Sequence, residues 1–337
     1  MTFSEPLLSL FAVLAAALLS AGMTWALRPA LLRHALATPN ARSSHRVPTP
    51  QGAGIAVIAA TLAVAGVATA CAGAVAQNIP VAVFTASLFM AIVGFADDVK
   101  SIPVATRLLL QALAVGAIIF TAPGEIRIAP PCPLWIERGL LLLAGLWFVN
   151  LVNFMDGLDW MTVAEIVPIT GAMVVLGSLG EFPLPATLVA AALCGAMLGF
   201  APFNRPVATI FLGDVGSLPI GLLLGWCLLQ LAYHQQFAAA LLLPMYYLLD
   251  ATTTLLRRLA RREPFWAAHR SHFYQRATDN GFTVSQVVGE VFALNIALAA
   301  LAAGSIMAPS VTIKVACLAV GAVAAALLLR RFARPRA

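Results

Sequence analysis

The chain of 337 residues is 61 % hydrophobic and only 10 % charged, with a mean hydropathy of +0.93 and a formal net charge of +6. Soluble domains average about 25 % charged residues, so this composition excludes an ordinary water-soluble protein. The five cysteines are scattered without a CxxC pair, which indicates neither a disulfide framework nor a zinc site. The positive charge is interpreted through membrane topology, and we expect no nucleic-acid partner.

Eleven apolar runs approach the roughly 20 residues that span a bilayer. The first, Pro6–Leu27, follows Glu5 and precedes Arg28, which argues against a cleaved signal peptide. We therefore expect an all-α polytopic membrane protein with about 11 transmembrane helices in a single integral membrane catalytic domain, residues 1–337. The other ten runs are Gly52–Gly73, Pro80–Ala96, Val104–Thr121, Gly139–Val152, Met161–Gly180, Pro185–Ala201, Gly216–Tyr233, Phe237–Leu256, Ser285–Ile306 and Val311–Leu329.

The Lys and Arg residues predict the orientation. With eleven spans the termini lie on opposite sides, and all but three of the 20 Lys and Arg residues fall on the side of the C-terminus. The three exceptions are Arg127, Arg138 and Lys314. Because cytoplasmic loops are enriched in Lys and Arg, we expect the N-terminus outside and the C-terminus in the cytoplasm. The expected cytoplasmic loops are about 28–51, 97–103, 153–160, 202–215 and 257–284.

Carboxylates gather at the cytoplasmic ends of these runs, where proximity to hydrocarbon makes a functional role the first hypothesis. Asp97 and Asp98 end the third predicted helix, and Lys100 follows them. Paired carboxylates can bind Mg²⁺ or deprotonate a nucleophile. The alternative is a solvated helix C-terminus, but the helix dipole disfavours negative charge there.

A polar stripe ends the fifth predicted helix. Asn150, Asn153 and Asp156 follow one another at intervals of three residues, so in a helix they share one face. Gly157 then allows a turn before Asp159. The alternative to a binding function is a hydrogen-bonded contact between helices.

Asp214 lies between glycines at the start of the eighth predicted helix. An ordinary N-cap explains an aspartate there equally well. The same position suits Mg²⁺ and a diphosphate, because hard cations prefer oxygen ligands and the N-terminus of a helix favours anions.

A basic loop follows the ninth predicted helix. Arginine forks match phosphate oxygens, so its second half is expected to bind substrate, whereas Arg257–Arg262 is explained by attraction to anionic lipid. A softer signal comes from His45 and the Pro- and Gly-rich residues 48–54, which a rigid re-entry turn also explains. The expected substrate-binding residues of the loop are His269, Arg270, His272 and Arg276.

Together these features predict one pocket with carboxylates for a metal, arginines and histidines for phosphates, and a rim exposed to lipid. Such a pocket suits a reaction between a water-soluble diphosphate and a membrane-bound phosphate. The rival hypothesis is a multi-helix transporter or lipid flippase. Transporters usually carry charges near the membrane midplane and internal inverted repeats, and neither is evident here.

In these motifs the chain resembles the polyprenyl-phosphate N-acetylhexosamine-1-phosphate transferases. This family includes the phospho-MurNAc-pentapeptide transferase and the enzymes that initiate O-antigen. The resemblance extends from Ser44 to Arg276. Its motifs are His45 with Pro48-Thr49-Pro50, Asp97-Asp98, Asn150 to Asp159, Asn204 with Asp214 to Ser217, and the His269–Arg276 loop.

The resemblance implies a Mg²⁺-dependent phosphoglycosyltransferase, with Mn²⁺ as a substitute. Asp214 and Asn153 would hold the metal, and Asp97, Asp98 and Asp156 would be catalytic. Between a base that assists direct attack and a covalent nucleophile, direct attack is favoured, because a phosphate is already an anionic nucleophile. The remaining substrate-binding residues would be His45, Lys100, Arg107, Asn150, Asp159, Asn204, Phe211, His269, Arg270, His272 and Arg276.

The implied partners are a UDP-N-acetylsugar, undecaprenyl phosphate and membrane lipid, and the family allows a homodimer. The implied location is the bacterial inner membrane, with the active site on the cytoplasmic face. Three departures from the family pattern are Trp160, where a glycine is usual, His-Arg-Ser-His in place of a denser histidine cluster, and Ser101, where an acidic residue or a lysine is usual. The second departure resembles the O-antigen branch that uses UDP-FucNAc or UDP-QuiNAc, with UDP-GlcNAc as the alternative.

Overall fold

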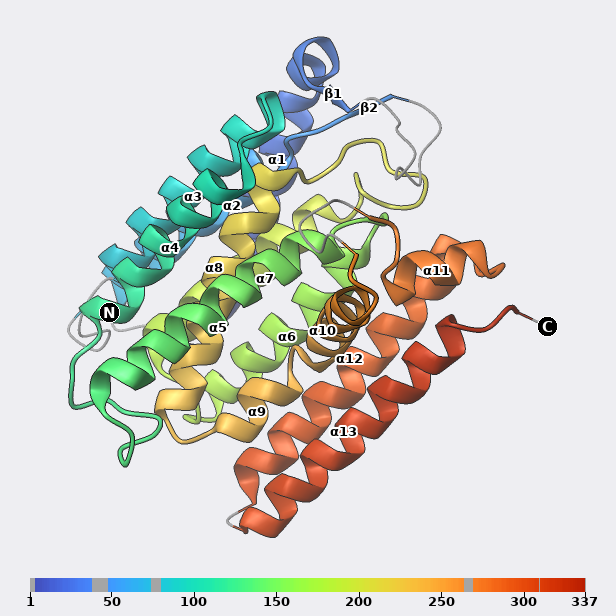
Figure 1. Cartoon of the computed structure of the whole chain (residues 1–337). Helices are drawn as coiled ribbons and strands as arrows, with labels where there is room; N and C mark the ends of the chain where they lie inside the picture. The colour runs from blue at the N-terminus through green and yellow to red at the C-terminus, as the bar shows by residue number, and fades with distance from the viewer. Residues whose placement is uncertain (1–3, 38–47, 74–79, 264–268, 309, 337) are drawn as a thin grey trace.

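The computed structural model describes the chain except residues 1–3, 38–47, 74–79, 264–268, 309 and 337. Within the described residues, thirteen α-helices are accompanied by one antiparallel pair of very short strands, β1 (Leu36–Ala37) and β2 (Thr49–Pro50). Most helices run side by side in one bundle, and the two termini lie at opposite ends of it (Figure 1). The expected all-α polytopic fold is confirmed.

Nine of the described helices are long and apolar enough to cross a membrane. A further apolar helix, α7 (Leu184–Phe200), has 17 residues. Each of these ten helices contains most of one predicted span. The nine are α1 (Glu5–His34), α2 (Gly54–Ala72), α3 (Val81–Val99), α4 (Val104–Thr121), α5 (Leu134–Met155), α6 (Met161–Ser178), α8 (Asp214–Tyr233), α12 (Val284–Met307) and α13 (Val311–Phe332).

The predicted ninth span, Phe237–Leu256, is not one helix. It is divided into α9 (Phe237–Leu242) and α10 (Met245–Ala260), with Pro244 between them. Proline has no backbone N–H to donate to the preceding turn, so the helical hydrogen bonds are interrupted here and a new helix begins. The expectation of a single helix is therefore wrong for this stretch, and the number of membrane crossings remains a prediction.

The core is centred on α7, in which 14 of 17 residues are buried. This helix packs against α1, α2, α6 and α8. Two glycines bring α1 very close, since a Cβ added at Gly195 or Gly199 would lie 2.0 Å from the carbonyl oxygen of Val13 or 2.2 Å from that of Ala17. Small residues at helix contacts give the tight packing on which membrane bundles depend.

Candidate functional site

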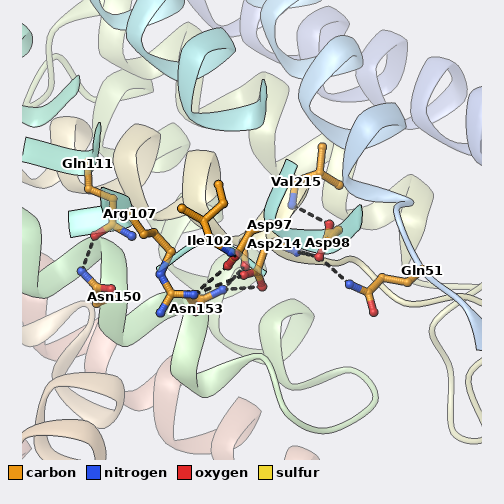
Figure 2. Close-up of polar contacts among 11 residues, drawn as sticks. Gln51, Asp97, Asp98, Ile102, Arg107, Gln111, Asn150, Asn153, Asp214 and Val215 are labelled. Carbon is orange, nitrogen blue, oxygen red and sulfur yellow. Dashed lines mark hydrogen bonds and ion pairs between the residues drawn. The ribbon is translucent and has the colours of Figure 1, made fainter. Parts of the chain in front are cut away.

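The site begins where α3 crosses the start of α8. A Cβ added at Gly94 of α3 would lie 2.2 Å from the carbonyl oxygen of Asp214, so only glycine permits this approach. Gly54 of α2 and Gly216 of α8 make a second close contact of the same kind. The two contacts bring Asp97 and Asp98, one turn beyond Gly94, to the N-terminus of α8 (Figure 2).

Asp98 caps α8 from another helix. Its Oδ1 accepts from the backbone N–H of Asp214 at 2.9 Å, and its Oδ2 accepts from that of Val215 at 3.0 Å. The side-chain amide of Gln51 also donates to Oδ1. A carboxylate is stabilised at the positive end of a helix. The alternative interpretation of Asp97 and Asp98, a solvated helix C-terminus, therefore does not hold for Asp98.

The guanidinium of Arg107 lies beside both Asp97 and Asp214. Nη1 of Arg107 lies 2.7 Å from Oδ2 of Asp97 and 4.0 Å from Oδ2 of Asp214 (Figure 2). The other oxygen of Asp97 accepts from the backbone N–H of Ile102 at 2.6 Å, which fixes the carboxylate. The guanidinium thus neutralises part of a cluster of three carboxylates.

The two asparagines of α5 share a face, as predicted, but have different partners. Nδ2 of Asn153 donates to Oδ1 of Asp214 at 2.7 Å and to Oγ of Ser217 at 2.9 Å. The amide nitrogen of Asn153, not its oxygen, therefore faces Asp214 and holds that carboxylate in place. One turn away from this cluster, Nδ2 of Asn150 donates to the buried side-chain oxygen of Gln111 at 2.6 Å.

Asp156 directly follows α5 and is half-buried. Its carboxyl accepts a hydrogen bond from the hydroxyl of Thr162. Desolvation, together with the negative charges of Asp98 and Asp159, raises the pKa of Asp156 to about 6. Asp156 therefore lies off the helix that was expected to carry it, in the turn beyond Asn153.

Trp160 adopts the left-handed backbone conformation, with φ of 64°, that a glycine would occupy more readily. Two contacts hold it there: its backbone N–H donates to Oδ1 of Asn204 at 2.8 Å, and its indole N–H donates to the carbonyl of Ala201 at 2.6 Å. Asp159 makes a parallel link, since its Oδ2 accepts from the backbone N–H of Ala208 at 2.9 Å. Asn204 and Asp159 thus join the turn after α5 to the segment before α8.

Phe211 lies in the same segment and is half-buried. Its backbone N–H donates to the carbonyl of Pro50 at 2.8 Å, and its carbonyl accepts from Gly52 and Ala53. This pairing continues β2 into a bridge between Gln51 and Phe211. The Pro- and Gly-rich segment is therefore a support that carries Gln51 to Asp98.

The basic loop contains α11 (Phe273–Asp279), whose N-terminus is tied to Asp250 of α10. The backbone N–H groups of Phe273 and Tyr274 donate to the two oxygens of Asp250 at 3.0 and 3.1 Å. The hydroxyl of Tyr274 donates to the carbonyl of Phe154 at 2.9 Å, next to Asn153. The loop is thereby held against the turn after α5.

Several predicted residues lie in this loop or near it. Arg270 pairs with Asp279 at 3.2 Å, and Arg276 lies over the ring of Phe273 with its guanidinium carbon 5.8 Å from the ring centroid. Lys100 is exposed just beyond α3. His45 lies outside the described residues.

Three residues of the site were missed by the sequence analysis: Gln51, Gln111 and Asp250. Glutamines carry no charge and gave no signal within apolar or loop sequence. Asp250 did carry a sequence signal, because a carboxylate within an apolar stretch is a candidate functional residue. The structure buries it fully.

Two cavities are lined by elements that also carry residues of the site. A polar cavity of about 790 Å³ is bounded by Asp159, Thr49, Thr209 and Arg28, together with the first residues of α12. An apolar cavity of about 240 Å³ lies between α4, α5, α8 and α9. Val149 and Gly221 of its wall are four residues, or one helical turn, from Asn153 and Ser217 of the cluster.

No group of three or more His, Cys, Asp or Glu side chains converges in the described part of the chain in a way that would hold a metal ion. A magnesium ion does not need such a cage, since it is usually bound by one or two carboxylates together with substrate phosphates. Asp97 and Asp214 supply two carboxylates, and the guanidinium of Arg107 already places a cation beside both. The donor set therefore fits Mg²⁺.

Comparisons with known proteins agree with this chemistry. Residues 79–232 match the model of glycosyl transferase family 4. A phospho-N-acetylmuramoyl-pentapeptide-transferase of Streptococcus gordonii is 27 % identical over 62 % of this chain and 67 % of its own length. Decaprenyl-phosphate N-acetylglucosaminephosphotransferases of Mycobacterium leprae and Mycolicibacterium smegmatis are 26 % and 28 % identical, each over 75 % of this chain and 72 % or 71 % of their own length.

Proposed function

We propose that the chain, whose residues 79–232 match glycosyl transferase family 4, is a polyprenyl-phosphate hexosamine-1-phosphate transferase. It would transfer an N-acetylhexosamine 1-phosphate from a UDP-sugar to undecaprenyl phosphate. The products are a polyprenyl-diphospho-sugar and UMP. The observation that carries the proposal is the carboxylate cluster, whose negative charge Arg107 partly neutralises. Asp159 lines the polar cavity, and Val149 and Gly221 of the apolar cavity lie one helical turn from the cluster.

The polar cavity is the proposed site of the UDP-sugar. Its hydroxyl groups and Arg28 suit a nucleotide diphosphate, and its wall includes Asp159. Phe211 offers a ring for the uracil in the segment that also contains Asn204. His269, Arg270, His272 and Arg276 hold the diphosphate and the sugar, with His45 and Lys100 as further contacts from the loops.

The apolar cavity is the proposed site of the polyprenyl chain. It is lined by apolar and aromatic side chains such as Val115, Phe148 and Trp226. A chain in this cavity would lead its phosphate past Asn150 and Gln111 to Arg107, because each step along α4 and α5 is one turn. Arg107 would then exchange a carboxylate for a phosphate oxygen, which its guanidinium binds equally well.

Asp97 and Asp214 are the proposed holders of Mg²⁺, and Asn153 orients Asp214 through its amide nitrogen. Asn153 would be a further ligand only with its side-chain oxygen turned to the ion. The bound ion would neutralise charge on the diphosphate of the donor, and Mn²⁺ would substitute for it. Asp98 keeps α8 and Asp214 in place through its two backbone hydrogen bonds. Asp156 lies in the turn between this cluster and Asp159 and completes the proposed catalytic set.

In the proposed reaction, an oxygen of the lipid phosphate attacks the phosphorus that is bonded to the sugar. The bond from that phosphorus to the UMP oxygen breaks, and UMP leaves with the electron pair. A carboxylate of the cluster takes any proton that the lipid phosphate still carries. Direct attack needs no covalent enzyme intermediate.

The proposed location is the bacterial inner membrane, with the site on the cytoplasmic face, where the loops rich in Arg are expected. The proposed role is the first membrane step of a cell-surface glycan such as O-antigen. UDP-GlcNAc is the first donor to test, because two of the relatives are named for N-acetylglucosamine, and UDP-FucNAc and UDP-QuiNAc follow. A homodimer remains part of the proposal.

The test uses purified protein in detergent with Mg²⁺, undecaprenyl phosphate and a panel of UDP-N-acetylsugars, and it measures UMP release. We expect release that requires the lipid and is abolished by EDTA. Release of UDP would contradict the mechanism, because it would mean ordinary glycosyl transfer. No release with any donor from folded protein would favour a transporter or lipid flippase.

A further inference from the structure

Asp250 of α10 is fully buried and accepts five hydrogen bonds, although no predicted role was attached to it. Two come from the backbone N–H groups at the start of α11, at 3.0 and 3.1 Å. Two weaker ones come from the hydroxyls of Tyr246 and Thr254, each at 3.3 Å. The fifth involves Nδ1 of His272, at 3.2 Å. A buried charge persists only when it is satisfied in this way.

This network has a consequence for the tautomer of His272. A carboxylate is an acceptor, so the Nδ1 atom that faces Asp250 must carry the proton. Nε2 is then the nitrogen of His272 that remains for another partner. The ring is almost buried and stacks with His269 and Tyr274, with centroid separations of 4.9 and 5.7 Å, so it has little freedom to turn.

The same network fixes the position of α11. Tyr274 donates to the carbonyl of Phe154, and a Cβ added at Gly157 would lie 2.1 Å from the tyrosine hydroxyl. The absence of a side chain at Gly157 therefore lets α11 dock on the turn that carries Asp156. Asp250 holds one end of this contact by accepting from the first two backbone N–H groups of α11. The backbone N–H of His272 donates to the side-chain oxygen of Gln275 at 3.4 Å, as part of a capping box at the same helix start.

We propose that Asp250 is a positioning residue for the donor: it fixes the Nδ1–H tautomer of His272 and holds α11 against the turn after α5, so that Nε2 of His272 faces the UDP-sugar. The statement about the donor rests on the proposed function. The statements about the tautomer and the docking of α11 do not. An orienting carboxylate behind a histidine is a recurrent arrangement in sites where the geometry of the imidazole matters.

The main variant is Asp250→Asn, which keeps the size of the side chain but cannot accept from every donor. We expect KM for the UDP-sugar to rise about tenfold, equivalent to about 1.4 kcal/mol, while KM for undecaprenyl phosphate stays unchanged. Tyr246→Phe and Thr254→Val are matched controls, because each removes one donor to the same carboxylate and leaves the His272 contact in place. Both are expected to keep the wild-type KM.

A readout independent of turnover is ¹⁵N NMR of histidine-labelled protein, with His272→Gln used to assign the resonance. We expect an Nδ1-protonated His272 in the wild type and in both controls, and loss of that signature in Asp250→Asn. Tryptic cleavage after Arg270 or Arg276 should become faster in the same variant, because α11 loses its cap. If Asp250→Asn does not fold, His272→Gln is expected to reproduce the KM increase with α11 still capped.

Three results would overturn the proposal: a wild-type His272 without a proton on Nδ1, an unchanged donor KM in Asp250→Asn, or an equal rise of both KM values. A protein that shows the NMR signature but turns over no UDP-sugar would retain the orienting role of Asp250 and refute the proposed function instead. The two failures are therefore distinguishable.

Discussion

The backbone N–H of Asp214 donates to the side chain of Asp98 at 2.9 Å, so the carboxylate at the end of α3 closes the start of α8. The neighbouring N–H of Val215 is taken by the second oxygen of the same side chain. Asp98 thereby fixes the backbone of Asp214, from which the side chain of Asp214 extends. Much of the effect of Asp98 on catalysis is expected to pass through this contact.

Replacing Asp98 with Asn should separate the cap from the chemistry. An amide has one acceptor oxygen, so one of the two N–H groups would lose its partner, and loss of a cap costs about 1–2 kcal/mol. We expect a lower melting temperature in detergent and a large loss of UMP release. Asp214→Asn is the control, since its backbone N–H remains: activity should fall while the melting temperature changes little. Equal melting temperatures for the wild type and Asp98→Asn would contradict the capping role.

Replacing Arg107 with Met should strengthen binding of a divalent cation. Arg107 lies beside both Asp97 and Asp214, so its charge competes with any ion that the two carboxylates would hold. We expect Mn²⁺ alone to bind about tenfold more tightly to the variant, equivalent to about 1.4 kcal/mol, although UMP release falls. Electron paramagnetic resonance of free Mn²⁺ measures the affinity.

Lys100→Met is the control for Arg107→Met, because Lys100 is exposed just beyond α3 and carries the same charge. It should leave Mn²⁺ affinity within about twofold of the wild type, as expected for a charge screened by water and salt. Unchanged or weaker Mn²⁺ binding by Arg107→Met would show that the arginine does not compete with the ion.

Asp156 predicts a pH dependence of stability. Its pKa is raised from the ordinary 3.8 to about 6, chiefly by desolvation, so the folded protein favours the protonated carboxyl. The protonated carboxyl stabilises the folded protein by at most about 3 kcal/mol. This stabilisation is complete below about pH 3.8 and is lost as the pH rises through about 6. Asp156→Asn cannot ionise. The melting temperature of the variant relative to the wild type should therefore rise between pH 4 and pH 7, and a constant difference would contradict the prediction.

Gly94 predicts a steric effect on the site. An alanine Cβ there would lie 2.2 Å from the carbonyl of Asp214, so α3 must move away from α8 and the contact between Asp98 and Asp214 must lengthen. We expect Gly94→Ala to lose about 1–3 kcal/mol of stability and most of the activity. Gly116→Ala in α4 is the control, since its Cβ would meet neighbouring atoms at ordinary distances of 3.8 Å or more. A Gly94→Ala protein as active as the wild type would show that the helix crossing does not set the site.

The departure at Trp160 shows where a motif can mislead. A glycine is usual at this position, yet Trp160 adopts the positive φ of 64° that glycine favours. Hydrogen bonds to Asn204 and Ala201 offset the strain, which is of the order of 1–2 kcal/mol for a residue with a side chain. Nothing in the local sequence could predict this, because both partners lie about 40 residues further along the chain.

The sequence by itself determined the membrane class, the approximate extent of most helices and the carboxylates of the cluster, because runs of apolar residues and charges beside hydrocarbon are local signals. It also pointed to Asn153, and the resemblance to the transferase family added Arg107. The tertiary structure alone decided what these residues contact: the cap that Asp98 places on α8 and the amide nitrogen that Asn153 turns to Asp214. It also gave Gln51, Gln111 and Asp250 their roles, because their partners come from other helices and a hydrogen bond between distant segments leaves no pattern in the chain.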